Sequence, residues 1–229
     1  MPHDLSLNSG ERQTATNYSA IRADHRLRYE WADRRIPRAT FGVDAFCGNG
    51  YGTWLLSQSR FVIGIDGSQE AISAANNSFK RESNFYSASY FPFELPAESL
   101  DFVVALESIE HVPNGSAFFE VLCRSLKPQG TLIFSTPCED FLPHHSTGNH
   151  FHFRHYTLGE TLDLANSNGM ELMHFAGQNT YTITPEGMQG GLLEDEQMIL
   201  RESEPGQFII VFCRKSKIAY PSTAAKFGE

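Results

Sequence analysis

Val43–Gly52, which reads Val-Asp-Ala-Phe-Cys-Gly-Asn-Gly-Tyr-Gly, is an apolar segment that runs directly into a glycine-rich loop. Glycine accepts positive φ angles and has no Cβ, so such a backbone turns sharply and lies against a ligand. The apolar run Phe41–Phe46 predicts a strand before the loop, and Tyr51–Ser57 predicts a helix after it. Because the free N–H groups at a helix start face whatever binds there, the stretch predicts a ligand-binding unit.

The alternation of strand and helix continues on both sides of this unit. Apolar runs and turn residues separate the segments, and Lys127–Gly130 is predicted to be a turn. This rhythm favours an α/β fold with a doubly wound parallel sheet. Further strands are predicted at Phe61–Ile65, Asn84–Ala88, Leu100–Leu106, Thr131–Ser135, Met170–Phe175 and Phe208–Cys213, and helices at Tyr18–Arg34, Ala117–Leu126, Thr157–Asn166 and after the capping residue Ser68.

The length of 229 residues suits one α/β domain with short appendages. We expect residues 1–16 to form a flexible arm, 17–215 the folded domain and 216–229 a disordered tail. Two long segments, 138–156 and 180–205, interrupt the strand–helix rhythm. Long loops are usually functional or mobile, so we interpret both segments as lids over a binding site.

Composition disfavours several classes of partner. The formal net charge is −9 and the basic residues are scattered, whereas nucleic-acid binding depends on clustered phosphate contacts. No apolar run approaches the roughly 20 residues that span a bilayer, and the N-terminus does not resemble a signal peptide. The four cysteines lie far apart without a Cys-x-x-Cys pair, which supports neither zinc nor redox chemistry. We therefore expect a cytoplasmic protein with no nucleic-acid partner and no membrane span.

Two acids at strand ends sharpen the ligand prediction. Asp44 stands beside the glycine loop, where it suits the ammonium of an amino-acid moiety. Asp66 ends the next strand about 20 residues further on, where a carboxylate accepts both hydroxyls of a ribose. The loop spacing is not the Gly-x-Gly-x-x-Gly of dinucleotide sites, and the chain has no Tyr-x-x-x-Lys pair. Both observations disfavour a nicotinamide-dependent oxidoreductase.

Five stretches together carry a family resemblance: Val43–Gly50 with an Asp-x-x-Cys-Gly-x-Gly signature, Val62–Ser68, Leu95–Val104, Glu107–Val112 and Leu126–Gly130. They resemble the class I S-adenosylmethionine-dependent methyltransferases, in particular the branch called type 11. The resemblance implies S-adenosylmethionine as cofactor. It also implies a Rossmann-like, mostly parallel seven-stranded sheet with an antiparallel last strand, an N-terminal helix and lid segments.

Two flanking pieces resemble a narrower group of this family, whose domains often accompany glycan or O-antigen synthesis. One is Gly10–Arg12 with Asp24–Tyr29, and the other is Asn149–Thr157 followed by Gly177–Gln178. They favour a small-molecule or glycan acceptor.

The third strand departs from the family pattern. Family members commonly end it in Gly-Asp-Ala, whose acid contacts the adenine amine, but Tyr86–Tyr90 has no acid. We expect Ser89 to accept that hydrogen bond more weakly, and Tyr90 or Phe91 to pack on the adenine. Arg28 is expected to bind the cofactor carboxylate. The full predicted cofactor set is Arg28, Asp44, Phe46, Gly48, Gly50, Asp66, Gly67, Ser68, Ser89, Tyr90 and Glu107.

Candidate catalytic residues follow from the chemistry of methyl transfer. The cofactor supplies the reactive group, and the protein supplies alignment and sometimes a base. Glu107 and His111 follow the fourth strand, and His111 is suited to take a proton from a hydroxyl acceptor. His152 in the first lid is the third catalytic candidate. Alternatively, His111 lines the adenosine pocket or caps its helix.

The histidine-rich lid allows two further interpretations. His150, Arg154 and Tyr156 are predicted to bind the substrate, with Arg154 and Tyr156 suited to a phosphate or carboxylate. An extended His150-x-His152 pair with nearby acids would chelate a metal, but the resemblance argues against this, and we expect none. The sequence thus predicts a monomeric or homodimeric O-methyltransferase, with an N-methyltransferase or a non-catalytic cofactor-binding module as alternatives.

Overall fold

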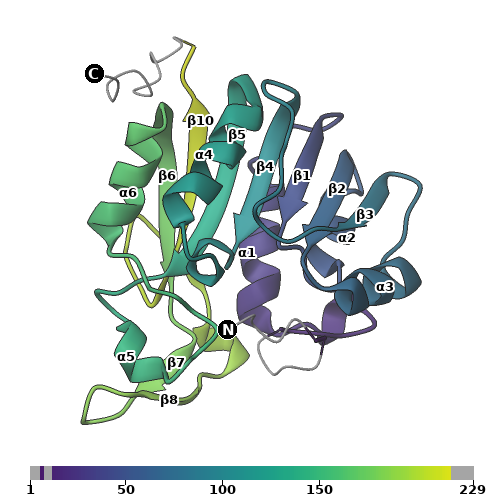
Figure 1. Cartoon of the computed structure of the whole chain (residues 1–229). Helices are drawn as coiled ribbons and strands as arrows, with labels where there is room; N and C mark the ends of the chain where they lie inside the picture. The colour runs from purple at the N-terminus through teal and green to yellow at the C-terminus, as the bar shows by residue number, and fades with distance from the viewer. Residues whose placement is uncertain (1–5, 8–11, 218–229) are drawn as a thin grey trace.

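The computed structural model describes residues 6–7 and 12–217 (Figure 1). The expected tail at 216–229 therefore lies outside the described residues apart from its first two. The helices are η1 (Tyr18–Ala20), α1 (Ala23–Asp33), α2 (Tyr51–Leu56), α3 (Gln69–Ser78), η2 (Ile109–His111), α4 (Gly115–Ser125), α5 (His144–Thr147), α6 (Leu158–Ser167) and η3 (Asp195–Gln197). The strands are β1 (Phe41–Ala45), β2 (Phe61–Asp66), β3 (Asn84–Ala88), β4 (Leu100–Leu106), β5 (Leu126–Pro137), β6 (Met170–Gln178), β7 (Tyr181–Ile183), β8 (Gln189–Leu192), β9 (Leu200–Glu202) and β10 (Phe208–Lys215).

The central sheet has the order β3-β2-β1-β4-β5-β10-β6-β9. The first five strands are parallel to one another, and β10 lies antiparallel between β5 and β6. The expected Rossmann-like sheet with an antiparallel last strand is confirmed. The structure adds a short edge strand, β9, and a separate β7–β8 hairpin (Figure 1). In such sheets ligands bind where the strand order reverses, which here is the carboxyl end of the neighbours β1 and β4.

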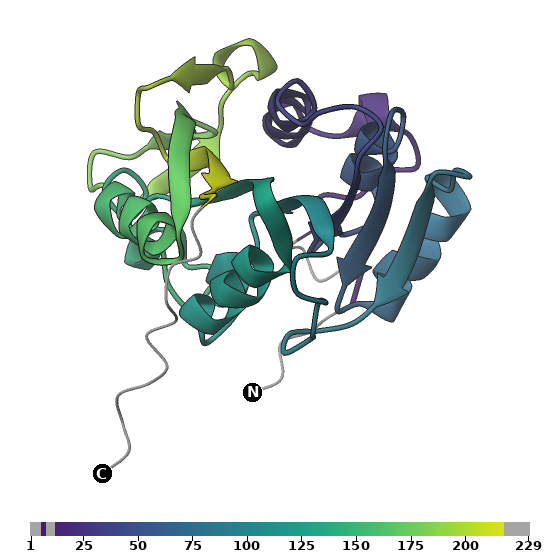
Figure 2. The same ribbon diagram turned by 90° about the horizontal axis from the view of Figure 1, so that it is seen from above.

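Each face of the sheet has its own hydrophobic core. On one face α4 and α6 contribute Phe118, Leu122 and Ala165. On the other, α1, α2 and α3 pack residues such as Trp31 and Leu56 against the strands. Figure 2 shows α4 and α6 on the opposite side of the sheet from α1. Continuous apolar strands such as Leu100–Leu106 are explained by this double coverage.

Three local predictions differ from the structure. The helix expected over Tyr18–Arg34 is broken, because Ile21 and Arg22 adopt extended ψ angles between η1 and α1. The turn expected at Lys127–Gly130 is part of β5, where Gln129 has φ 67° and the register with β4 shifts. Both predicted lids contain regular structure, namely α5 in the first and the β7–β8 hairpin, η3 and β9 in the second. None of the helices in the described ranges is long and apolar enough to cross a membrane.

Candidate active site

A cavity of about 530 Å³ opens where the glycine loop, the end of β4 and both predicted lids meet. Its volume falls within the range of about 300–1,000 Å³ that small-molecule sites occupy. Residues far apart in the chain contribute to it, from Arg12 to Phe208. The predicted site residues that line it are Arg28, Phe46, Gly48, Asp66, Gly67, Tyr90, Glu107, His111, His150 and His152.

Gly48 and Gly50, the two glycines of the Gly-x-Gly core, have different structural roles. Gly50 begins α2 with φ 90°, and a Cβ there would lie 2.7 Å from the Ala75 Cβ and 2.8 Å from the Tyr86 ring. Gly50 therefore permits close packing and does not line the cavity. Gly48 has φ 55°, and a Cβ built on it would meet no protein atom within 4 Å. The backbone at Gly48 thus faces open space, as expected where a ligand lies against it.

Asp66 is fixed at the end of β2 beside this loop. Its Oδ2 accepts from the Gly48 N–H at 2.9 Å, and its Oδ1 accepts from the Ser68 N–H at 2.8 Å. Ser68 itself caps α3 by accepting from the Ala71 N–H and does not line the cavity. The Arg12 guanidinium reaches Asp66 Oδ1 at 3.2 Å. Arg12, which belongs to the expected arm, therefore covers the carboxylate that was predicted to bind ribose.

Asp44 occupies a different place from the one expected. Its side chain is fully buried beneath the loop, where it accepts from the Tyr29 hydroxyl at 3.0 Å and the Thr53 hydroxyl at 2.6 Å. Burial raises the pKa of Asp44 to about 7, against the lowering effect of these two hydrogen bonds. Asp44 does not line the cavity, so the structure gives it a role in joining β1, α1 and α2 rather than in direct ligand contact.

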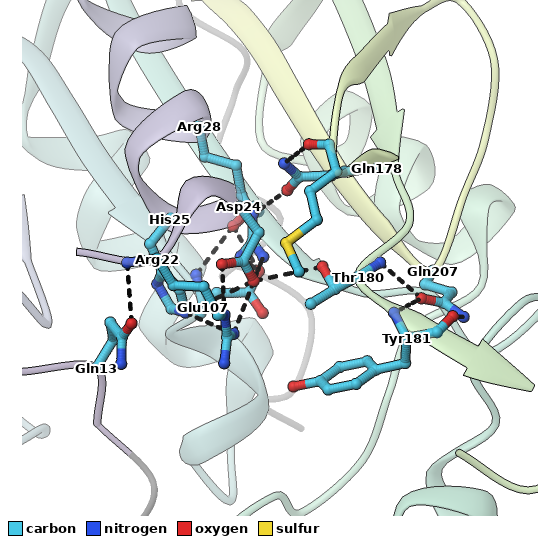
Figure 3. A network of polar contacts seen from close by, with 12 residues as sticks. Gln13, Arg22, Asp24, His25, Arg28, Glu107, Gln178, Thr180, Tyr181 and Gln207 are labelled. Carbon is cyan, nitrogen blue, oxygen red and sulfur yellow. Dashed lines mark hydrogen bonds and ion pairs between the residues drawn. The ribbon is translucent and has the colours of Figure 1, made fainter. Parts of the chain in front are cut away.

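Arg28 lies at the centre of a polar network that links α1 to the end of β6 and to Glu107 after β4 (Figure 3). Its Nε donates to Gln178 Oε1 at 2.6 Å, and its Nη1 lies 3.0 Å from Glu107 Oε1. Its Nη2 donates to Asp24 at 3.2 Å. The guanidinium is only 3% exposed and packs over Phe208. A guanidinium has five N–H donors, so these three contacts leave two for a ligand in the cavity.

Asp24 was not predicted from the sequence as a site residue. Both of its oxygens are held by Arg22 at 2.7 Å, and the Thr180 hydroxyl donates to it at 3.3 Å. Burial would raise the pKa of Asp24, but His25, Arg22 and Arg28 together hold it well below its usual range. This anion joins α1 to the start of the second predicted lid. The Asp24–Tyr29 stretch was noticed in the sequence, but no local pattern indicated its partners.

Ser89 and Tyr90 follow the end of β3, in the stretch where the sequence lacks the acid expected from the family resemblance. Tyr90 lines the cavity, packs against the Cα of Gly67, and donates its hydroxyl to the His111 carbonyl at 3.2 Å. Its ring lies 6.3 Å from that of Phe46. Ser89 does not line the cavity; its N–H donates to the Asp66 carbonyl. Tyr90 is thus in place for the predicted stacking, whereas Ser89 is outside the lining.

Histidines gather on the opposite wall. His111 stacks on Phe46 at 6.5 Å and meets the His152 ring edge-on at 4.7 Å. His152 Nδ1 lies 2.8 Å from His155 Nε2, and His155 Nδ1 lies 2.7 Å from the Leu142 carbonyl. Burial lowers the pKa of His155 to about 4, so its ring is neutral at neutral pH. The cluster connects η2 to the 138–156 segment.

Two predicted substrate residues lie outside the cavity lining. Arg154 pairs with Glu160 at 2.6 Å, and its guanidinium packs on the Tyr156 ring. Tyr156 is buried, and its hydroxyl lies where a Cβ on Gly115 would project. These two side chains hold the end of the segment against α6 and α4. Cavity-lining residues outside the predicted site set include Arg12, Arg22, His25, Glu110, Asn149, Tyr181 and Gln189.

Comparison with known proteins supports a common origin for the central region. Residues 43–134 match the family described as a methyltransferase domain. A probable S-adenosylmethionine-dependent methyltransferase of Mycolicibacterium smegmatis is 30% identical over 151 residues, or 63% of this chain and 58% of that protein. A ubiquinone biosynthesis O-methyltransferase of Pseudomonas fluorescens is 32% identical over 117 residues, or 48% of this chain and 50% of that protein. The chain thus spans about half the length of these curated relatives.

Solved structures share the fold over more of the chain. An S-adenosylmethionine-dependent methyltransferase from Mesorhizobium loti covers 82% of this chain with a TM-score of 0.61 and 19% identity, and 98% of that protein is matched. The [4+2]-cyclase SpnF covers 82% of this chain with a TM-score of 0.59 and 14% identity, and 80% of that protein is matched. At these identities the likeness concerns the fold alone, and the chemistry has to be argued from the residues of the site.

Proposed function

We propose that this chain, which carries a class I S-adenosylmethionine-dependent methyltransferase domain, transfers a methyl group to a hydroxyl of a small molecule or glycan. One observation carries the proposal. A single cavity joins the Gly48–Asp66 corner, where a nucleoside fits, to a wall that contains His111, His150 and His152. Cofactor and acceptor would therefore meet in one cavity, as in-line transfer requires.

S-adenosylmethionine is the cofactor of this domain, and it supplies a methyl group on a sulfonium sulfur. The residues present fit it. The open space at Gly48 admits a ligand against the backbone, and the Asp66 carboxylate beside it accepts ribose hydroxyls once Arg12 moves away. Tyr90 offers its ring to the adenine in place of the absent acid. Phe46 and Gly67 complete the same corner.

The methionine end of the cofactor is assigned to Arg28 and Glu107. The two remaining N–H donors of Arg28 suit a carboxylate. Glu107 is about one-sixth exposed, at 17%, and one of its oxygens already binds Arg28 and Ser135. We assign the ammonium to Glu107 instead of the buried Asp44. Because Glu107 is engaged in this way, we place proton transfer on the histidines and not on Glu107.

The acceptor is assigned to the histidine wall. A hydroxyl that gains a methyl group loses its proton, and the imidazoles of His111 and His152 are suited to receive it or to hold the oxygen. His150 contributes to the same wall from the lid. The O-methyltransferase name of the Pseudomonas relative agrees with an oxygen acceptor. The resemblance of the flanking pieces to glycan-associated domains favours a sugar hydroxyl.

We further propose that the protein is cytoplasmic and acts as a monomer or a homodimer. The four cysteines are free and buried, which agrees with a reducing compartment. A nitrogen acceptor and a cofactor-binding module without catalysis are the alternatives.

Incubation with methyl-labelled cofactor and a panel of hydroxylated sugars, phenols and amines tests the proposal. We expect label in an O-methyl product, identified by mass spectrometry. Label on an amine would favour the nitrogen alternative, and cofactor binding without transfer to any acceptor would favour the non-catalytic module.

A further inference from the structure

Three potential metal ligands converge at the acceptor end of the cavity. Glu110 and His111 come from η2, and His152 comes from the 138–156 segment. One ligand atom from each lies within 4.8 Å of the others. Ligands at about 2.1 Å from one ion lie up to about 4.2 Å apart. The three groups therefore need only a small side-chain adjustment to share an ion.

Hydrogen bonds to fixed partners determine which ring nitrogen of His152 has the lone pair. The Asn149 amide nitrogen only donates, and it lies 3.1 Å from His152 Nε2, so Nε2 accepts. His152 Nδ1 then donates to His155 Nε2 at 2.8 Å, and His155 Nδ1 donates to the Leu142 carbonyl at 2.7 Å. An ion at His152 Nε2 would displace the Asn149 amide from this lone pair. In metal sites a histidine that binds the ion through one ring nitrogen usually donates the N–H of its other nitrogen to a fixed partner.

His111 is oriented in the same manner. Its Nδ1 lies 3.3 Å from the Phe151 carbonyl, which leaves Nε2 with a lone pair in the neutral ring. Stacking on Phe46 holds the plane of the ring. The Glu110 carboxyl group beside it is fully buried, and in its ionised form it would require a compensating cation nearby. Protonated imidazoles or a metal ion would each provide that charge.

We propose that Glu110, His111 and His152 bind a divalent transition-metal ion that holds the acceptor hydroxyl. Two imidazoles and one carboxylate favour ions such as Zn²⁺, Mn²⁺ or Co²⁺ over Mg²⁺ or Ca²⁺. Three protein ligands leave coordination positions open toward the cavity. The acceptor role rests on the proposed function, and the site differs from the sequence-based expectation of no metal.

The ion would replace a free base in the reaction. A metal ion lowers the pKa of a bound hydroxyl, so the proton leaves to water. The acceptor oxygen then forms a bond to the methyl carbon as the carbon–sulfur bond breaks. The sulfonium becomes a neutral thioether, which balances the charge of the lost proton. Because η2 and the 138–156 segment both contribute ligands, the ion would also fix the lid to the sheet.

Titration of the tag-free, chelator-treated protein with Co²⁺ tests this directly, by calorimetry and by the visible absorption of bound Co²⁺. We expect one ion per chain, with absorption of a nitrogen- and oxygen-ligated site. His111→Ala and His152→Ala should each remove this binding. His174→Gln is the matched control, because His174 is exposed on β6 outside the cavity lining. A parent protein that binds no Co²⁺, or alanine variants that bind it as the parent does, would overturn the proposal.

His155→Gln tests the orienting hydrogen bond without removing a ligand. We expect Co²⁺ affinity to fall about 10- to 100-fold, with thermal unfolding recorded to confirm that the variant is folded. Unchanged affinity would contradict the tautomer argument. Binding of S-adenosylhomocysteine to the same samples separates the two proposals. Cofactor binding without Co²⁺ binding overturns only the metal site, and Co²⁺ binding without cofactor binding overturns only the proposed function.

Discussion

The two walls of the cavity are built in different ways. The cofactor wall consists of strand ends and the turn that follows β1, and its main-chain N–H groups hold Asp66 from two sides. The acceptor wall consists of side chains from η2 and the 138–156 segment, held by rings and by single carbonyl contacts. The first wall is fixed by the sheet itself, whereas the second depends on how a long segment folds over it.

This difference separates cofactor affinity from the chemical step. Changes at the strand ends should alter the binding of cofactor, because those residues are assigned to its nucleoside and methionine parts. Changes at the histidines should alter turnover and metal binding while cofactor affinity is retained. Three substitutions test this separation, and a fourth tests the buried carboxyl group beneath the cofactor wall.

His111→Ala, a change on the acceptor wall, should have the largest effect, and it should alter turnover rather than cofactor affinity. We expect kcat to fall about 10²- to 10⁴-fold, because either a base or a metal ligand is lost. Affinity for S-adenosylhomocysteine should change by less than about tenfold, or 1.4 kcal/mol. His145→Ala is the matched control, since His145 is exposed in the same segment and does not line the cavity. A turnover number equal to that of the parent would remove His111 from the chemistry.

Asp66→Ala should have the largest effect on the cofactor wall. Loss of two charge-assisted hydrogen bonds to ribose, at about 1.5 kcal/mol each, predicts about 100-fold weaker binding of S-adenosylhomocysteine by calorimetry. Asp163→Ala, an exposed acid on α6, serves as the control. Affinity equal to that of the parent would show that the ribose assignment is wrong.

Asp44→Asn should affect the pH dependence of stability. Because burial raises the pKa of Asp44 from 3.8 to about 7, the folded state binds this proton more tightly than the unfolded chain does. The parent therefore loses stability as the pH rises through this window. Asparagine does not titrate, so between pH 3.8 and pH 7 the variant should gain about 4 kcal/mol of stability relative to the parent, because each of the roughly three pKa units corresponds to about 1.4 kcal/mol. Urea unfolding of parent and variant at several pH values between 3.8 and 7 measures this difference. If the unfolding free energy changed with pH by the same amount in both proteins, Asp44 would not be a buried carboxyl group that binds a proton on folding.

Arg12→Ala should have the smallest effect, and in the opposite direction. The Arg12–Asp66 ion pair competes with ribose for the same oxygen. A partly exposed pair contributes up to about 1 kcal/mol, so its removal should tighten S-adenosylhomocysteine binding up to about fivefold. Arg201→Ala on β9 is the control, because Arg201 is exposed and outside the cavity lining. Weaker binding in Arg12→Ala would instead make Arg12 a cofactor ligand.

The contrast between the cofactor wall and the acceptor wall also explains which parts of the site could be predicted from the sequence. The glycine loop and Asp66 belong to local patterns, because a strand, a turn and a helix start are each encoded by a few neighbouring residues. Glu110 and His152 lie close together because two segments that are distant in the chain make contact. The hydrophobic periodicity of the sequence cannot predict such a contact. Asp44 was predicted at the correct strand end, but its burial followed from Tyr29 on α1.

Arg154 and Tyr156 show the same limit on the acceptor wall. The charge of Arg154 and the aromatic ring of Tyr156 suited a substrate-binding role. In the structure Arg154 pairs with Glu160 and the Tyr156 hydroxyl lies against Gly115, both outside the cavity. The helix capped by Thr157, by contrast, was predicted from the sequence, because the capping box of Thr157 and Glu160 that starts it involves residues only three apart.

Calorimetric titration of the purified chain with S-adenosylhomocysteine tests the central claim most directly. The open space at Gly48 beside a fixed Asp66 predicts binding of one molecule per chain with micromolar affinity, about −8 kcal/mol. No heat of binding with either S-adenosylhomocysteine or S-adenosylmethionine would contradict the assignment of this cavity to the cofactor.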